Sequence, residues 1–278
     1  MELLVVLGVP LAGGLLLTLF GHKERAAELN VAMSFLTFVA AGLLTARIIA
    51  EGPIMVMNEL FFIDSFNVFL VTLTAFVGFT TSLFSRPYMR NEHHEGKLNP
   101  ARLRLYHSMF QMFMFTMLLA LLTNNMGILW VAMEAATLTT VLLVSLYRTP
   151  ASLEAAWKYF ILCGVGIAQA LFGTILLYFA AEKILGAGGT ALLWTHLNDV
   201  KGQLEPTVLS LAFVFLLVGY GTRLGSRRCT TGCRTLTPKV PPPSPRCSPD
   251  CSSMSRCTPW CGPRCWSTAP CERISPVT

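Results

Sequence analysis

The sequence predicts an all-α membrane protein with about seven transmembrane helices, followed by a disordered tail rich in Cys, Pro and Arg. Of its 278 residues, 53% are hydrophobic and only 13% are charged, whereas about 25% of the residues in a soluble domain are charged. Several apolar runs approach the roughly 20 residues that a helix needs to cross the hydrocarbon layer. Together these observations exclude an ordinary soluble protein.

Seven apolar segments are expected to form the spans. The first run has Glu2 in place of a basic segment and is closely followed by a second run, so we expect it to be retained rather than cleaved as a signal peptide. Pro150 after Thr149 indicates that the sixth helix starts near Ser152. We expect a tight turn at residues 124–125 and a charged loop at residues 86–104. The expected spans are residues 3–20, 30–49, 66–84, 109–122, 126–147, 159–181 and 207–220.

The Lys and Arg residues of the loops predict the orientation of these spans. Most of them follow the first, third and fifth spans, and the opposite side has only Arg47, Lys183 and Lys201. Because cytoplasmic loops of membrane proteins are enriched in positive charge, we expect the N-terminus to lie outside.

The composition changes abruptly near Gly221. Residues 1–222 contain 12 Lys and Arg, 13 Asp and Glu and one cysteine, whereas residues 223–278 contain nine basic and two acidic residues, eight cysteines and ten prolines. The net charge of +6 is therefore −1 from the first part and +7 from the tail. It does not indicate a nucleic-acid-binding surface on the first part. The tail has too few aliphatic residues to bury a core, so we expect it to be disordered.

Two ionisable residues fall within or near the predicted spans. Glu134 lies about midway along the fifth span, where a carboxylate is costly unless it is paired, hydrated or protonated. Lys158 lies near the start of the sixth helix, from which a lysine can also extend to the interface. A pair formed by the two would meet the physical requirement of a proton relay. The alternative is a buried acid that only joins two helices through a hydrogen bond.

Residues 1–222 contain no motif for a cofactor or metal. They lack a phosphate loop, a dinucleotide fingerprint, a haem-attachment motif and a cysteine set for an iron–sulfur cluster. His93 and His94 are adjacent on an expected loop without further ligands. We therefore expect no cofactor, no metal and no catalytic residue in this chain.

Six short segments together form a recognisable pattern. They are YMRNE at 88–92, FTMLL at 115–119, TNN at 123–125, WVAMEAAT at 130–137, SLEAAWKY at 152–159 and VGYGT at 218–222. The pattern resembles the antiporter-like membrane subunits shared by respiratory complex I and membrane-bound hydrogenases, most closely component F of hydrogenase-4. The resemblance covers nearly all of residues 1–222.

This resemblance implies a multi-pass subunit of the cytoplasmic (inner) membrane with its N-terminus outside. It implies proton translocation coupled to redox chemistry in partner subunits, both membrane and peripheral, of a hydrogenase or an NADH-dehydrogenase-like complex. Glu134 matches the family's fifth-helix glutamate, and Lys158 matches its sixth-helix basic residue.

The resemblance ends at Arg223, where the family has a lysine, then a segment reading AGLAPLHNWLPDAHPE and several more membrane helices. One base restored before the Arg223 codon recovers this segment. If Arg223 is AGG and residues 224–229 are CTG GGC TCG CGC CGC TGC, the restored frame reads lysine and then AGLAPL. The shift remains compatible with the family up to Trp260. We expect residues 223–278 to be out of frame and, because arginine keeps its proton near neutral pH, no proton pumping by the chain as written.

The alternative is a stand-alone transporter or assembly protein whose cysteine-rich tail binds metal or a partner. The tail cysteines recur mostly with three intervening residues, without the CxxC pairs or histidines of common structural zinc sites. A cytosolic tail also disfavours disulfides. Leucine and valine codons that are read out of frame account for the cysteines as TGC or TGT codons.

Overall fold

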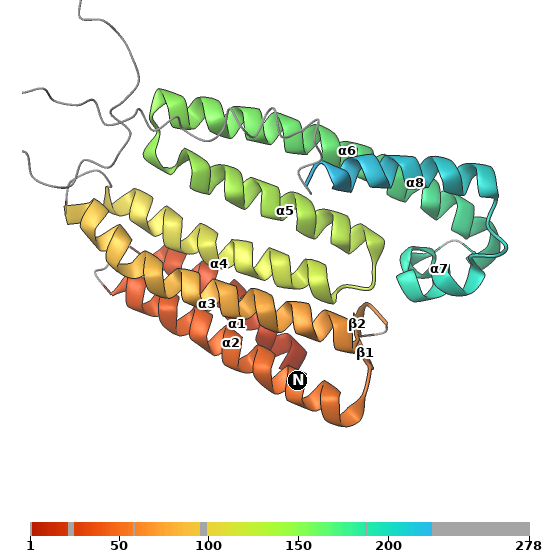
Figure 1. Cartoon of the computed structure of the whole chain (residues 1–278), viewed down its shortest axis with the longest axis horizontal. Helices are drawn as coiled ribbons and strands as arrows, with labels where there is room; N and C mark the ends of the chain where they lie inside the picture. Colours follow the sequence, from red (N-terminus) through yellow and green to blue (C-terminus); the bar gives the residue numbers. More distant parts are fainter. Residues whose placement is uncertain (1, 22–24, 58, 95–98, 187, 224–278) are drawn as a thin grey trace, which may run out of the picture. The chain divides into compact units, whose positions relative to one another are not determined.

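Helices and one short hairpin form the described part of the protein. The computed structural model describes residues 2–21, 25–57, 59–94, 99–186 and 188–223. The expected tail beyond Arg223 lies outside the described residues. The elements are α1 (Glu2–Phe20), α2 (Ala26–Glu51), β1 (Ile54–Val56), β2 (Phe61–Ile63), α3 (Ser65–His94), α4 (Pro100–Leu122), α5 (Met126–Val144), η1 (Ser145–Tyr147), α6 (Pro150–Leu185), η2 (Gly189–Leu192), α7 (Trp194–Val200) and α8 (Pro206–Gly221) (Figure 1).

Six of the described helices, α1 to α6, are long and apolar enough to cross a membrane. The expected seventh span is also helical, but α8 has only 16 residues and so extends about 24 Å, less than the ~30 Å of the hydrocarbon layer. The prediction of an all-α, multi-pass membrane protein is confirmed, with six full-length candidate spans and one shorter apolar helix among the described residues.

The expected charged loop at residues 86–104 is wrong, because most of this stretch is helical. The helix α3 continues to His94 and α4 already begins at Pro100. Charged side chains are tolerated at these helix ends because they reach water or a partner. Arg86 donates a hydrogen bond to Glu28 of α2 at 2.7 Å. The side chains of His93 and His94 lie outside the described residues.

The start of α6 agrees with the sequence signal. Thr149 caps the helix, and its hydroxyl oxygen accepts a hydrogen bond from the backbone N–H of Ser152 at 3.2 Å. The helix then runs for 36 residues, considerably longer than the expected apolar span, because its first turns extend beyond the apolar segment.

Three connections meet at the end of the bundle where α4 passes into α5: the β1–β2 hairpin between α2 and α3, the α4–α5 turn, and the segment with α7 between α6 and α8. The strands β1 and β2 pair antiparallel, and Phe61 of β2 bridges to Thr123. Asn124 donates its backbone N–H to Leu60 at 2.8 Å and accepts from the N–H of Trp194 at 2.9 Å. The turn at Asn124 therefore links the hairpin to α7, an arrangement absent from the sequence prediction.

The helix α8 lies side by side with the second half of α6 (Figure 1), and small residues allow the two to approach closely. A Cβ atom added at Gly219 would lie 2.6 Å from the backbone nitrogen of Ala170, and one added at Gly173 would lie 3.0 Å from the carbonyl oxygen of Ala212. Such approach is available only to helices without side-chain bulk at the interface. This packing fixes the C-terminal end of α8 against the membrane-spanning bundle.

Candidate functional site

Glu134 is positioned by a well-capped helix. The side-chain oxygen of Asn125 accepts hydrogen bonds from the backbone N–H groups of Gly127 at 2.8 Å and Ile128 at 3.3 Å, which starts α5. Glu134 lies near the middle of this helix and is half-buried. Its Oε2 atom is buried and has no hydrogen-bond partner among the described residues. The Oε2 atom can therefore accept a hydrogen bond from a bound water molecule.

Arg223 reaches the same part of α5 from the end of α8. Its Nη2 atom donates a hydrogen bond to the carbonyl oxygen of Met133 at 2.7 Å. The same carbonyl accepts from the hydroxyl of Thr137 at 3.0 Å. Within the described part of the chain, no ion pair of 4.0 Å or less joins Arg223 to Glu134, and the Nε atom of Arg223 is buried without a partner.

Tyr220 adds a third polar group without a partner. It lies one turn before Arg223, and its hydroxyl is buried and unpaired among the described residues. Glu134, Tyr220 and Arg223 thus each have a buried polar atom whose hydrogen-bonding capacity is unused. Because an unsatisfied buried polar atom costs about 1–3 kcal/mol, these groups are suited to hold bound water molecules.

Lys158 is not paired with Glu134. Its ammonium group forms an ion pair with Glu154, one turn earlier in α6, and about half of its side chain is exposed. Because α6 begins at Pro150, Lys158 lies on the second to third turn, close to the helix end. The direct pair with Glu134 that the sequence allowed does not form in the described structure, where Lys158 lies near the start of α6 and pairs with Glu154.

A different contact joins the two helices near this level. The hydroxyl groups of Thr140 in α5 and Tyr159 in α6 are 3.3 Å apart. Trp130 also crosses from α5, since its indole N–H donates to the carbonyl oxygen of Ile167 at 2.8 Å. The hydroxyls of Thr137, Thr139 and Thr140 bond mainly to carbonyl oxygens of their own helix. The contacts of Thr140 with Tyr159 and of Trp130 with Ile167 fix the distance between α5 and α6 around Glu134.

A cleft of about 360 Å³ lies between α5 and α8. Asn124 and Trp194 line it at the end where the three connections join, and Leu129 and Tyr220 line it deeper in the bundle. Tyr220 is one turn from Arg223, so the cleft extends toward the level of Glu134. Neither this cleft nor the role of Tyr220 was predicted from the sequence, although Tyr220 lies within the VGYGT segment that carried part of the resemblance.

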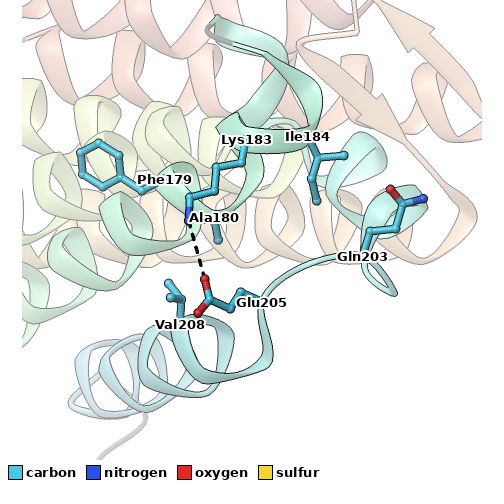
Figure 2. A pocket seen from close by; sticks show the side chains of 7 residues that line it. All are labelled: Phe179, Ala180, Lys183, Ile184, Gln203, Glu205 and Val208. Atoms are coloured by element: carbon cyan, nitrogen blue, oxygen red, sulfur yellow. Dashed lines mark ion pairs between the residues drawn. The ribbon is translucent and has the colours of Figure 1, made fainter.

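A second pocket, of about 260 Å³, lies between the end of α6 and the start of α8 (Figure 2). Lys183 and Glu205 face each other across it, with 3.7 Å between Nζ and Oε2. Both side chains are largely exposed, so water screens their attraction. The described residues include no group of three or more His, Cys, Asp or Glu side chains that could hold a metal ion. The Glu134 region is therefore the stronger candidate site.

Comparisons with known proteins identify relatives of one kind. The chain is 44% identical to a hydrogenase-4 component F homolog of Methylacidiphilum infernorum over 225 residues, which are 81% of this chain and 46% of the relative. It is 33% identical to NADH-quinone oxidoreductase subunit N of Geobacillus kaustophilus over 122 residues, 41% of this chain and 23% of the relative. No family model matches the chain.

Solved structures show the same fold. A chain of the membrane-bound sulfane sulfur reductase, an archaeal respiratory membrane complex, superimposes with a TM-score of 0.71 at 18% identity, over 85% of this chain and 47% of that one. A chain of respiratory complex I from Thermus thermophilus gives 0.63 at 20% identity, over 83% and 46%.

The chain spans about half the length of the first curated relative and of both structural neighbours. The match of 225 residues is close in length to the 222 residues that precede the change of composition. In sequence the chain is therefore similar to hydrogenase-4 component F and to NADH-quinone oxidoreductase subunit N, and in fold it is similar to membrane subunits of respiratory complexes.

Proposed function

We propose that residues 1–222 form the N-terminal part of a membrane subunit in a hydrogenase-4 or complex I-like respiratory assembly of the cytoplasmic membrane. In this proposal, redox chemistry in partner subunits drives proton translocation through the membrane subunit. The names of the relatives support the class of assembly. The observation that carries the proposal is the buried carboxyl oxygen of Glu134, midway along α5, which has no hydrogen-bond partner in the described part of the chain.

The mechanism is an electrostatic relay. Moving a positive charge toward a half-buried carboxyl group favours its ionised form, and moving the charge away favours protonation. The end of α8 approaches α5 next to Glu134, at the carbonyl oxygen of Met133. A lysine at position 223 would supply at this place a charge that can be gained and lost. Lys158, at the start of α6, would act as a further charge beside the relay rather than as a direct partner of Glu134.

The cleft between α5 and α8 supports a route for water toward Glu134. Its lining reaches from Asn124 and Trp194 to Tyr220. In the proposed orientation, with the N-terminus outside, this end of the bundle faces the outer side. The basic side chains at the opposite end favour that orientation, because cytoplasmic ends carry the excess of Lys and Arg; among the described residues they are Arg25, Arg86, Arg90, Arg102, Arg104 and Arg148.

We further propose that residues 223–278 are read out of frame. The abrupt rise in Cys, Pro and Arg supports this interpretation, as does the compatibility of the shifted codons with the family segment. In the proposed native frame, position 223 is a lysine. The guanidinium of Arg223 does not release its proton near neutral pH, so the chain as written does not relay protons.

Proton transport by the frame-restored subunit tests the function. The restored subunit is assembled with its partner subunits in inverted membrane vesicles, and proton uptake is measured while the redox reaction runs. The change Glu134→Gln should abolish coupled uptake, because an amide cannot carry a proton through the relay. The matched control is Glu205→Gln, which removes an exposed carboxylate outside the candidate site. Unchanged uptake with Glu134→Gln would remove Glu134 from the mechanism.

A further inference from the structure

We propose that a cleft between α1, α4 and the end of α5 binds the phosphate headgroup of an anionic phospholipid. The cleft has a volume of about 500 Å³. Three arginines line it, namely Arg102, Arg104 and Arg148, and none of the described residues in its lining is acidic. The proposal depends on the membrane class of the protein and is independent of proton translocation.

The helix ends place the three arginines together. Because α4 begins at Pro100, Arg102 and Arg104 lie in its first turns, where the positive end of the helix dipole also favours an anion. Arg148 follows η1, and its backbone adopts the left-handed conformation, with φ of 48°. This turn directs the chain from α5 into α6 and leaves Arg148 at the rim of the cleft.

These arginines differ from others in the described part of the chain. Arg86 is paired with Glu28 at 2.7 Å, and Arg47 is paired with Glu51 at 2.9 Å. By contrast, Arg104 and Arg148 have no ion pair among the described residues, and the side chain of Arg102 bonds only to the carbonyl oxygen of Tyr147, at 3.3 Å. Like charges in one cleft repel each other, and a bound anion relieves that repulsion.

The surface beside the cleft is apolar, which favours a lipid over a free anion or an acidic protein segment. Leu142 lines the cleft and is 41% exposed. Thr18 lines it from α1, and its neighbours Leu15 and Leu19 are 57% and 66% exposed. A phospholipid would place its phosphate among the arginines and its acyl chains along these leucines. Basic pockets between membrane helices at the cytoplasmic side bind lipid headgroups in this way.

Lipid binding by the purified full chain tests the proposal. Delipidated protein in detergent is titrated with phosphatidylglycerol or phosphatidylcholine, and bound lipid is counted by native mass spectrometry. We expect saturable binding of one or a few phosphatidylglycerol molecules and no comparable binding of phosphatidylcholine. The double change Arg104→Gln and Arg148→Gln should weaken phosphatidylglycerol binding about fivefold for each arginine, on the order of 25-fold together.

The matched control is the double change Lys183→Gln and Lys201→Gln, which removes the same charge near the other end of α6 and should leave binding unchanged. A second variant, Ser145→Asp, places a negative charge in the cleft lining and should weaken binding while all three arginines remain. Replacing Arg104 and Arg148 by lysine should keep most of the affinity. Circular dichroism verifies that each variant retains its helices.

Three results would overturn the proposal. One is equal binding of the anionic and the zwitterionic lipid. Another is undiminished phosphatidylglycerol binding by both the glutamine double variant and Ser145→Asp. The third is displacement of the lipid by millimolar inorganic phosphate, which would make the cleft a site for free anions. If neither lipid nor phosphate binds and an acidic partner subunit protects the arginines from chemical modification, the cleft is a protein interface instead.

Discussion

The side chain of Arg223 donates a hydrogen bond from Nη2 to the main-chain carbonyl oxygen of Met133, 2.7 Å away, one residue before Glu134. The two residues are separated by 90 positions in the chain. The position at which the resemblance to the family ends is therefore in direct contact with the helix that carries the predicted proton-path glutamate. A substitution at position 223 therefore changes a contact that lies one residue from Glu134.

The charge at position 223 should decide whether the relay works. In the frame-restored subunit, replacing the restored lysine at position 223 by arginine should preserve assembly but reduce coupled proton transport to the level of membranes without the subunit. The reason is that arginine holds its proton at neutral pH, whereas a lysine in a half-buried site exchanges it. Proton uptake by inverted vesicles measures the effect, and quantification of the assembled complex serves as its control. Full uptake with arginine would show that position 223 need not release a proton.

The packing of α6 against α8 should tolerate no added side chain at Gly219. The change Gly219→Ala places a Cβ atom 2.6 Å from the backbone nitrogen of Ala170, and we expect a loss of about 1–3 kcal/mol in the free energy of unfolding. Gly221→Ala is the matched control in the same helix, because nothing lies within 4 Å of its added Cβ; it should change stability by less than about 0.5 kcal/mol. Unfolding in detergent measures both, and equal stabilities would contradict the packing.

A buried polar cluster should stabilise the association of α2, α3 and α4. Gln111 donates to the side-chain oxygen of Asn30 at 2.8 Å and to the hydroxyl of Ser34 at 2.9 Å, and Asn30 donates to Ser82 at 3.1 Å. Each is no more than 2% exposed. Gln111→Leu should cost about 1–3 kcal/mol, because it leaves Asn30 and Ser34 without this partner.

A double-mutant cycle tests that cluster. Asn30→Leu together with Gln111→Leu should cost less than the sum of the two single changes, with a coupling of about 0.5–3 kcal/mol, since both members of the hydrogen bond are removed. Denaturation of the four proteins in the same detergent supplies the cycle. Strict additivity would show that Gln111 and Asn30 do not interact.

The place where the hairpin, the α4–α5 turn and α7 meet should depend more on Asn124 than on the nearby hydrogen bond between Glu59 and His196. Asn124 is 4% exposed, and its Nδ2 atom donates to the backbone carbonyl of Glu59 at 2.9 Å and to Thr195 at 3.0 Å. Asn124→Ala should cost about 1–3 kcal/mol. Glu59 and His196 form a pair at 2.6 Å with partly exposed side chains, so Glu59→Gln should cost at most about 1 kcal/mol. The reverse order in thermal unfolding would contradict this assignment.

The membrane class and the positions of the helices could be predicted because long apolar runs and helix-start residues are local signals. Thr149 and Pro150 predicted the start of α6. The hairpin of β1 and β2 was missed because its three-residue strands provide no periodic pattern of their own. It is held by backbone pairing with residues far along the chain, such as Phe61 with Thr123.

The candidate site could be predicted only in part. A carboxylate in an apolar run identifies Glu134 from sequence alone, and the structure adds that its Oε2 atom has no partner among the described residues. The contact of Arg223 with Met133 joins residues 90 positions apart, which no local pattern encodes. The sequence alone allowed Lys158 to lie either at the membrane interface or within the bundle. The structure adds an ion pair with Glu154, one turn earlier, which favours the interface.

We propose that residues 1–222 continue, one base out of register, into the rest of a proton-translocating subunit. Sequencing of the genomic DNA and the transcript across the codons of Gly221 to Arg228 tests it most directly. We predict that restoring one base before codon 223 yields AAG followed by codons for AGLAPL, whether the base was lost in sequencing or by a mutation in the gene. Confirmed codons that do not spell this segment in the restored frame would contradict the frame shift and make the cysteine-rich tail a genuine part of the protein.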